Sequence, residues 1–343
     1  MTRLFAILAA LLLASCAREV PPGVTELTYA TPYPPSHPFS RADQRWMDFV
    51  AQESGGRLVI KPQWSGKLLS ADMSMTELRH GVADIGLITP IYVRGGTHLI
   101  RVQSGFYSGA DSVESQLAVF ACLQERVPQI STELAGLEVL AVQGGLLPGI
   151  LTRNRRVQSL DDLRGLRIRA PTELLPVLAS LGADPVNMPM GEVYSALAKG
   201  VIDGVVAPPD TFRALHFAEV ARYFYELRVP RGAYPARAMG SRRWNTLEPW
   251  QRELLTRSRA VWEAALADEI RQSEAAGREV GKGRITITPA SAEDQARFDA
   301  IYLRDGEANA RSLERFGIDG LSVFRLARAS IPARDQVSCG GIS

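Results

Sequence analysis

The segment LRGLRIRAPTELLPVLASLGADPVNMPMGEVYSALAKGVIDGVVAPP, residues 163–209, has the pattern of a strand–helix–strand–helix–strand unit. Side chains alternate along a strand, so Leu166 and Ile168 lie on one face of its first strand. Arg169 lies on the other face, at the point where this strand ends. Gly200 ends the second helix as a C-cap. Alternating strands and helices of this length predict parallel sheets built from βαβ units.

A shorter copy of this pattern occurs earlier in the chain. Glu77–Gly86 (ELRHGVADIG) resembles Ala196–Val205 (ALAKGVIDGV), and both read as a helix end, Gly, a β-branched residue, Asp and a buried strand. The glycine turns the chain, and the aspartate can satisfy backbone donors in the turn. Either two generic turns share this chemistry by chance, or two similar α/β domains face each other. In the second case a ligand would bind between them, beyond the carboxyl ends of the strands.

The composition is that of a globular protein of about two domains. The chain has 343 residues, 39 of them Lys or Arg and 37 Asp or Glu, which gives a net charge of +2. We find no basic block with interleaved aromatic residues, which argues against nucleic acid as a partner. The four histidines form no cluster and no metal-ligand spacing occurs, so we expect no metal and no cofactor.

The N-terminus has the pattern of an export signal. A short positive stretch precedes the apolar run Leu4–Leu13, and the run ends in Leu-Ala-Ser-Cys at residues 13–16. This end resembles a bacterial lipobox, whose cysteine is lipidated, while a plain signal peptide cleaved nearby is the alternative. No later apolar run is long enough to span a bilayer. We therefore expect a periplasmic protein that touches the membrane only through a lipid on Cys16.

A long amphipathic helix is predicted over Thr246–Val280. At ~1.5 Å per residue it would be about 50 Å long, more than one small domain needs, so we expect it to lie across two domains. The expected division of the chain is a signal peptide (1–16), a linker (17–25), domain I (26–147 plus 236–262), domain II (148–235 plus 263–330) and a C-terminal tail (331–343).

Two further cysteines, Cys122 and Cys339, remain in the exported part of the chain. An oxidising compartment permits a bridge between them, which would hold the tail against a helix of the first half. The alternative is two unpaired thiols, because no sequence rule gives the distance between the two residues.

Several motifs resemble those of the solute-binding proteins of TRAP (tripartite ATP-independent periplasmic) transporters. The sequence DDLRGLRIRAP at Asp161–Pro171 is similar to the family signature DLKGLKIRxP, and GEVYSAL at Gly191–Leu197 is followed by GVIDG as in the family. The resemblance covers about Glu26–Phe324. It implies a type II periplasmic-binding-protein fold, with two similar α/β domains around a ligand cleft and a long helix spanning both. It also implies capture of a small organic acid by hinge closure and delivery to a permease driven by an ion gradient.

The resemblance assigns a role to Arg169. It matches the arginine that in this family usually pairs with the substrate carboxylate, a role that suits the planar guanidinium. A structural ion pair is the alternative. Sialic-acid-type members have an asparagine where Ala207 stands and a second arginine where we align Gly149. The nearest arginines, at 153, 155 and 156, are expected on the surface, so a smaller or more apolar acid than sialic acid is expected.

Other pocket candidates follow from their positions at strand ends. His37, in the loop after the first strand, either donates to an anion or is a solvated loop histidine. Thr89 and Tyr92 follow the predicted strand Asp84–Ile88 and would face the cleft. The remaining candidates are expected to wall the pocket, with ordinary core packing as the alternative; they are Met190, Pro208 and Tyr234.

The sequence allows three functions to be weighed against its features. A binding protein that serves a permease agrees with export, two domains and the family motifs. A sensor that presents its bound acid to a signalling receptor has the same sequence features. An exported enzyme is disfavoured, because the sequence has no Gly-x-Ser-x-Gly elbow, Cys/His pair, metal motif or phosphate loop.

Overall fold

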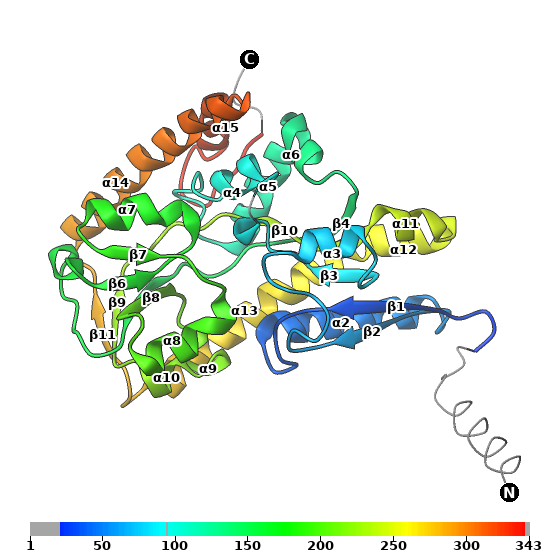
Figure 1. Ribbon diagram of the computed structural model, residues 1–343, viewed down its shortest axis with the longest axis horizontal. Helices are drawn as coiled ribbons and strands as arrows, with labels where there is room; N and C mark the ends of the chain where they lie inside the picture. The colour runs from blue at the N-terminus through cyan, green and yellow to red at the C-terminus, as the bar shows by residue number, and fades with distance from the viewer. Residues whose placement is uncertain (1–20, 94, 340–343) are drawn as a thin grey trace, which may run out of the picture.

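The structure is a computed structural model that describes residues 21–93 and 95–339, and it consists of two α/β domains side by side (Figure 1). This confirms the predicted fold class. The predicted signal peptide, including Cys16, lies outside the described residues. Within the described ranges, no helix has the length and apolar character needed to cross a membrane.

Each domain contains one sheet. The sheet of the first domain has the strand order β2 (Leu58–Gln63), β1 (Thr25–Ala30), β3 (Ile85–Leu87), β10 (Tyr234–Gly240), β4 (Leu137–Gln143). The sheet of the second domain has the order β11 (Thr286–Pro289), β9 (Tyr223–Glu226), β5 (Gly149–Thr152), β8 (Gly204–Ala207), β6 (Arg167–Arg169), β7 (Asp184–Val186).

Both sheets are mixed, which corrects the expectation of parallel sheets. Strand β1 is parallel to β2 and β3, and β6 is parallel to β7 and β8. Strand β10 is antiparallel to both of its neighbours, and so is β5. The chain passes from the first domain into the second at β5 and returns to the first at β10. Because neither strand follows a crossover helix from a strand of its own sheet, neither is required to be parallel to its neighbours.

The repeated sequence pattern forms the same structure in both domains. Helix α3 (Ser74–Arg79) leads into β3, and α8 (Val193–Lys199) leads into β8. Asp84 accepts a hydrogen bond of 2.7 Å from the backbone N–H of Thr28 in β1. Asp203 accepts one of 2.8 Å from the backbone N–H of Arg167 in β6. The aspartate of each copy therefore ties its turn to the neighbouring parallel strand.

Helices cover both faces of the sheets. Those of the first domain include α2 (Pro38–Glu53), α4 (His98–Gln103), α5 (Val113–Arg126), α6 (Pro128–Glu133), α11 (Ser241–Thr246) and α12 (Pro249–Arg257). Those of the second domain include α7 (Leu175–Ser180), α9 (Thr211–Ala214) and α10 (Phe217–Val220).

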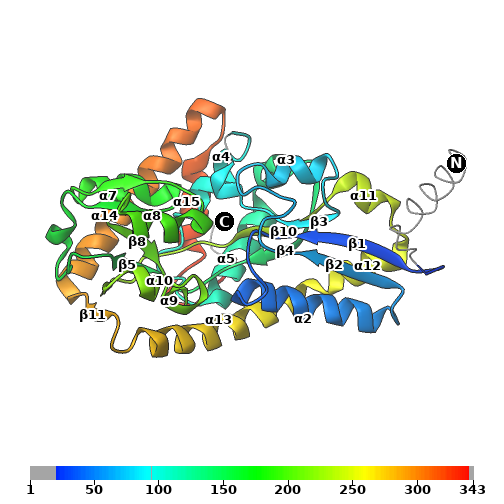
Figure 2. The same ribbon diagram turned by 60° about the horizontal axis from the view of Figure 1, so that its bottom comes forward.

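A long helix, α13 (Arg259–Gly281), runs along both domains, as predicted (Figure 2). It packs against α2 and β4 of the first domain and against α9 of the second. The expected single helix over Thr246–Val280 is divided, because Ser258 separates α12 from α13. The Ser258 hydroxyl accepts a hydrogen bond of 2.7 Å from the indole N–H of Trp46. The 23 residues of α13 still span about 35 Å, enough to reach both domains.

The last two helices return the chain to the first domain. Helix α14 (Ala292–Arg311) contacts α7 and α4, and α15 (Gly320–Ala329) packs against α5 and α4. The Phe324 ring meets Phe106 edge-on at 5.1 Å. The sequence assigned residues up to 330 to domain II, whereas the structure places α15 in the core of the first domain. A disulfide between Cys122 in α5 and Cys339 holds the tail there, with 5.4 Å between their Cα atoms.

Candidate ligand-binding site

A cavity of about 120 Å³ lies between the two domains. We call it the ligand cavity. Its size is similar to the roughly 150 Å³ of an engineered apolar cavity that holds benzene. An adjoining cavity of about 660 Å³ shares part of this wall. Most of the ligand-cavity wall is apolar and comes from both domains, with Phe39, Ile91, Leu146, Leu174, Val206, Leu215 and Ile270 among its residues.

Arg169 lies at the cavity wall, at the carboxyl end of β6, and is only 2% exposed. Its Nε donates to the carbonyl of Met188 at 3.0 Å, and its Nη2 donates to the hydroxyl of Tyr92 at 2.5 Å. No carboxylate is among the hydrogen-bond partners that the described residues offer it. Burial raises the pKa of Glu173, and the charge of Arg169 counteracts part of that change, but no described carboxylate satisfies the N–H groups of Arg169 directly. This position therefore favours an anionic ligand.

His37 is buried, which excludes the alternative of a solvated loop histidine. It is the N-cap of α2, where its Nδ1 accepts the backbone N–H of Phe39 at 3.2 Å. Its ring stacks on Tyr33 with 4.0 Å between centroids. Burial lowers the pKa of His37 to about 3, and the charges of Arg41 and Arg237 act in the same direction. The imidazole is therefore neutral near pH 7, and its remaining proton is on Nε2.

The structure brings together six of the seven residues predicted as ligand contacts. The wall of the ligand cavity includes Arg169, His37, Tyr92, Met190, Pro208 and Tyr234. Thr89 instead lines the adjoining cavity. The contact role of each residue stays a prediction, and their shared location is the structural observation.

The sequence did not predict Arg231, which also lines the cavity. It lies in the segment 227–233, which connects β9 to β10 between the domains. The position of the expected second arginine cannot hold a side chain, because a Cβ on Gly149 would lie 2.6 Å from the carbonyl oxygen of Tyr225. The guanidinium of Arg231 packs directly over Gly145 of the other connecting segment. In the sequence, Arg231 lies between Pro230 and Gly232, and a Pro-Arg-Gly sequence is typical of surface loops and does not indicate a cavity residue.

Two acidic residues at the cavity were also missed. Asp210 is 6% exposed, and its Oδ1 has no hydrogen-bond partner among the described residues. Burial raises the pKa of Asp210 to about 7, although Arg231 counteracts part of that change. Glu173 has a buried Oε2 without a described partner, and burial raises its pKa as well. The charged or titratable groups around Asp210 are Arg231, Glu274, Arg41, Arg213 and His216.

The connecting segments have the geometry of a hinge. Residues 144–148 join β4 to β5, and residues 227–233 join β9 to β10. The two segments meet where the N–H of Val229 donates to the carbonyl of Pro148 at 3.0 Å. Besides the Arg169–Tyr92 contact, the hydroxyl of Thr172 donates to the carbonyl of Ile91 across the cleft at 3.5 Å. These two hydrogen bonds join the cavity walls that the two domains contribute.

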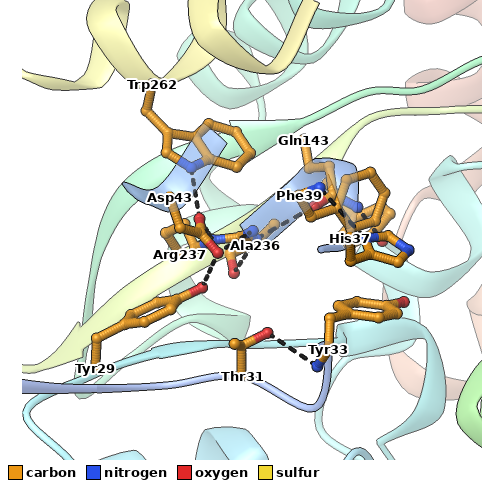
Figure 3. A network of polar contacts seen from close by, with 11 residues as sticks. Tyr29, Thr31, Tyr33, His37, Phe39, Asp43, Gln143, Ala236, Arg237 and Trp262 are labelled. Carbon is orange, nitrogen blue, oxygen red and sulfur yellow. Dashed lines mark hydrogen bonds and ion pairs between the residues drawn. The ribbon is translucent and has the colours of Figure 1, made fainter. Parts of the chain in front are cut away.

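A buried polar network lies beside Tyr33 and His37, two residues of the cavity wall (Figure 3). Arg237 in β10 and Asp43 in α2 are both 0% exposed and form an ion pair with 2.7 Å between Nε and Oδ1. Tyr29 donates to Oδ2 of Asp43 at 2.6 Å, and Trp262 of α13 donates to Oδ1 at 2.7 Å. The network joins the first sheet, α2 and the helix that spans both domains.

The chain matches one protein family and is similar to several known proteins. Residues 29–304 match the family described as bacterial extracellular solute-binding protein, family 7. A protein of Haemophilus influenzae is 25% identical over 180 residues, which are 52% of this chain and 54% of that protein. A solute-binding protein of Albidiferax ferrireducens is 23% identical over 268 residues, 75% of this chain and 70% of its own length. The aligned part thus spans about half of the first relative and more of the second.

Solved structures extend the likeness to nearly the whole chain. A TRAP solute-binding protein from Rhodoferax ferrireducens T118, crystallised with copurified benzoate, superimposes with a TM-score of 0.79. It is 25% identical in sequence, and the match covers 89% of this chain and 97% of that protein.

Proposed function

The chain belongs to family 7 of the bacterial extracellular solute-binding proteins, and from this premise we propose that it captures a small organic acid for a TRAP-type permease. The observation that carries the proposal is Arg169, a buried arginine at the interdomain cavity whose described hydrogen-bond partners include no carboxylate. A carboxylate that enters the cavity would give Arg169 the directly hydrogen-bonded anion that its described partners do not supply. Its two oxygens suit the parallel N–H groups of a guanidinium.

The surrounding groups support an anion at this position. The Tyr92 hydroxyl accepts a hydrogen bond from Arg169, so its own hydrogen is available to a ligand. His37 keeps a hydrogen on Nε2, because its Nδ1 accepts a backbone N–H. Arg231 adds a second positive charge at the cavity wall. Donors from both domains would then contact one carboxylate, which would favour the closed arrangement of the hinge.

We propose a compact monocarboxylate as the ligand class. The cavity of about 120 Å³ and its apolar wall fit a ring-sized hydrophobic body. The R. ferrireducens relative holds benzoate, an acid of this size. Sialic acid and sugar acids carry many hydroxyl groups, and those that face the apolar part of the wall, such as Ile91, Leu146, Leu174 and Val206, would be left without hydrogen-bond partners.

Delivery to the permease follows from the family. We propose that the mature chain is held at the membrane by a lipid on Cys16 and that hinge closure over the acid prepares it for the membrane subunits. We propose that each of the two domains is built on one of the two sheets and that α15 belongs to the first domain.

A thermal-shift screen of the mature protein tests the ligand class. Matched pairs isolate the carboxylate: benzoate against benzamide, and phenylacetate against phenylacetamide. We expect compact monocarboxylates to raise the melting temperature, since a ligand that binds only the folded state stabilises it by RT ln(1 + [L]/Kd). We expect the amides, glucuronate and sialic acid to leave it unchanged. Equal shifts with acids and amides, or none with any acid, would overturn the proposal.

A further inference from the structure

The buried network continues from the ion pair to the cavity through one glutamine. Arg237 Nη1 donates to Oε1 of Gln143 at 3.2 Å, and Gln143 Nε2 lies 2.9 Å from the hydroxyl oxygen of Tyr234. Gln143 and Tyr234 are directly opposite each other in the antiparallel pair of β4 and β10. Gln143 is 1% exposed, and Tyr234 is 8% exposed and lines the ligand cavity.

The direction of each hydrogen bond follows from chemistry. A guanidinium can only donate, so the atom of Gln143 that faces Arg237 must be the amide oxygen. The amide nitrogen must then face Tyr234 and donate to its hydroxyl oxygen. The Tyr234 hydroxyl is therefore an acceptor toward Gln143, and its own hydrogen points elsewhere.

That hydrogen has no protein acceptor among the described residues, since the hydroxyl of Tyr234 occurs there only as an acceptor. Burial raises the pKa of Tyr234, so the hydroxyl keeps its hydrogen at neutral pH. A buried hydroxyl at a cavity wall, with its oxygen satisfied and its hydrogen unused, is prepared to donate to whatever fills the cavity.

We infer that Gln143 is a positioning residue, held in one orientation by the Asp43–Arg237 pair, which makes Tyr234 donate its hydrogen to an oxygen of the bound ligand. The inference rests on the proposed function, because it assumes that the cavity holds an acid. It adds a second donor to the ligand carboxylate, from the β10 side, besides Arg169.

The rest of the network explains why the orientation is fixed. Asp43 accepts from Arg237 with both oxygens, at 2.7 and 3.2 Å. Tyr29 and Trp262 donate to the same two oxygens, so the carboxylate cannot turn without losing a partner. Arg237 is therefore held with Nη1 toward Gln143. A flipped amide would place its NH₂ against the guanidinium, a donor against a donor.

The test is a double-mutant cycle read by calorimetric titration with benzoate. Tyr234→Phe removes the donated hydrogen, and we expect affinity to fall about tenfold to a hundredfold, as for a hydrogen bond to a charged group. Gln143→Glu keeps the shape but offers only acceptors to Tyr234, so the hydroxyl turns away from the ligand. We expect a loss of similar size from this variant. In the Tyr234→Phe background, we expect Gln143→Glu to reduce the affinity for benzoate only slightly further.

Charge repulsion is the competing explanation for a loss in Gln143→Glu, and the cycle separates the two. Repulsion would weaken binding by the same factor with or without the Tyr234 hydroxyl, and such additivity would overturn the inference, as would unchanged binding in either single variant. Gln143→Met removes both the donor and the acceptor of the side chain. We expect it to reduce the affinity for benzoate less than Gln143→Glu does, because it leaves the Tyr234 hydroxyl free to rotate and does not draw its hydrogen away from the ligand. Failure of the wild-type protein to bind benzoate would refute the proposed ligand class, and the inference with it.

Discussion

Replacing Asp43 by Asn tests how much the buried network contributes to the free energy of unfolding. The Asp43 carboxylate receives four hydrogen bonds, from Nε and Nη2 of Arg237, from Tyr29 and from Trp262, at distances of 2.6 to 3.2 Å. In Asp43→Asn an NH₂ group replaces one oxygen and faces two of these donors. Arg237, 0% exposed, keeps only neutral partners, the side chain of Gln143 and the carbonyl of Ala236.

The expected loss is about 3–5 kcal/mol, the range for removing one partner of a buried ion pair. This is a large fraction of the roughly 5–15 kcal/mol that keeps a typical domain folded. Urea denaturation at pH 7, followed by circular dichroism, measures the loss as a lower midpoint at unchanged slope. Asp268→Asn is the matched control, because Asp268 pairs with Arg271 at 2.6 Å but is 44% exposed. We expect its midpoint to stay close to that of the wild type. A loss below about 1 kcal/mol for Asp43→Asn would show that the buried pair contributes no more than an exposed one.

Three further predictions concern single residues. Burial lowers the pKa of His37 to about 3, so between pH 7 and pH 5 the unfolded chain takes up a proton at this residue and the folded protein does not. Asn can still cap α2, and we expect the stability of His37→Asn relative to the wild type to rise by about 2 kcal/mol between pH 7 and pH 5, measured as the difference between their denaturation midpoints at the two pH values. Burial raises the pKa of Asp210 to about 7, so stability is lost as pH rises from about 4 to 7, and Asp210→Asn should melt above the wild type at pH 8 but not at pH 4. The Cys122–Cys339 bridge joins residues 217 positions apart, so Cys122→Ser should lower the unfolding free energy by about 2–4 kcal/mol, and a reductant should destabilise only the wild type.

Local chemistry explains what the sequence could predict. The turns before β3 and β8 each contain Gly, a β-branched residue and Asp within a few positions, so the repeat could be recognised locally. In each copy the aspartate accepts a hydrogen bond from a backbone N–H of the neighbouring strand. Arg169 could be found because it ends a strand of a recognisable unit. The family resemblance was confirmed by the match over residues 29–304.

Long-range packing explains what the sequence could not predict. Strand β10 contains Pro235 and Arg237, which are typical of loops or strand edges, and yet it lies between two strands of the first sheet. The register shifts next to Pro235, and Arg237 is neutralised by a carboxylate 194 positions away. The position of Arg231 also depends on long-range packing, because it lies at the cavity only where the two connecting segments meet. No local pattern encodes either contact.

Calorimetric titration of benzoate into the wild type, Arg169→Ala and Arg169→Lys tests whether Arg169 binds the carboxylate of the ligand. We expect measurable binding to the wild type, no detectable binding to Arg169→Ala and weakened binding to Arg169→Lys, because an ammonium cannot form two parallel hydrogen bonds to a carboxylate. Circular dichroism should show that all three proteins are folded. Equal affinity of Arg169→Ala and the wild type would contradict the claim that this arginine binds the carboxylate.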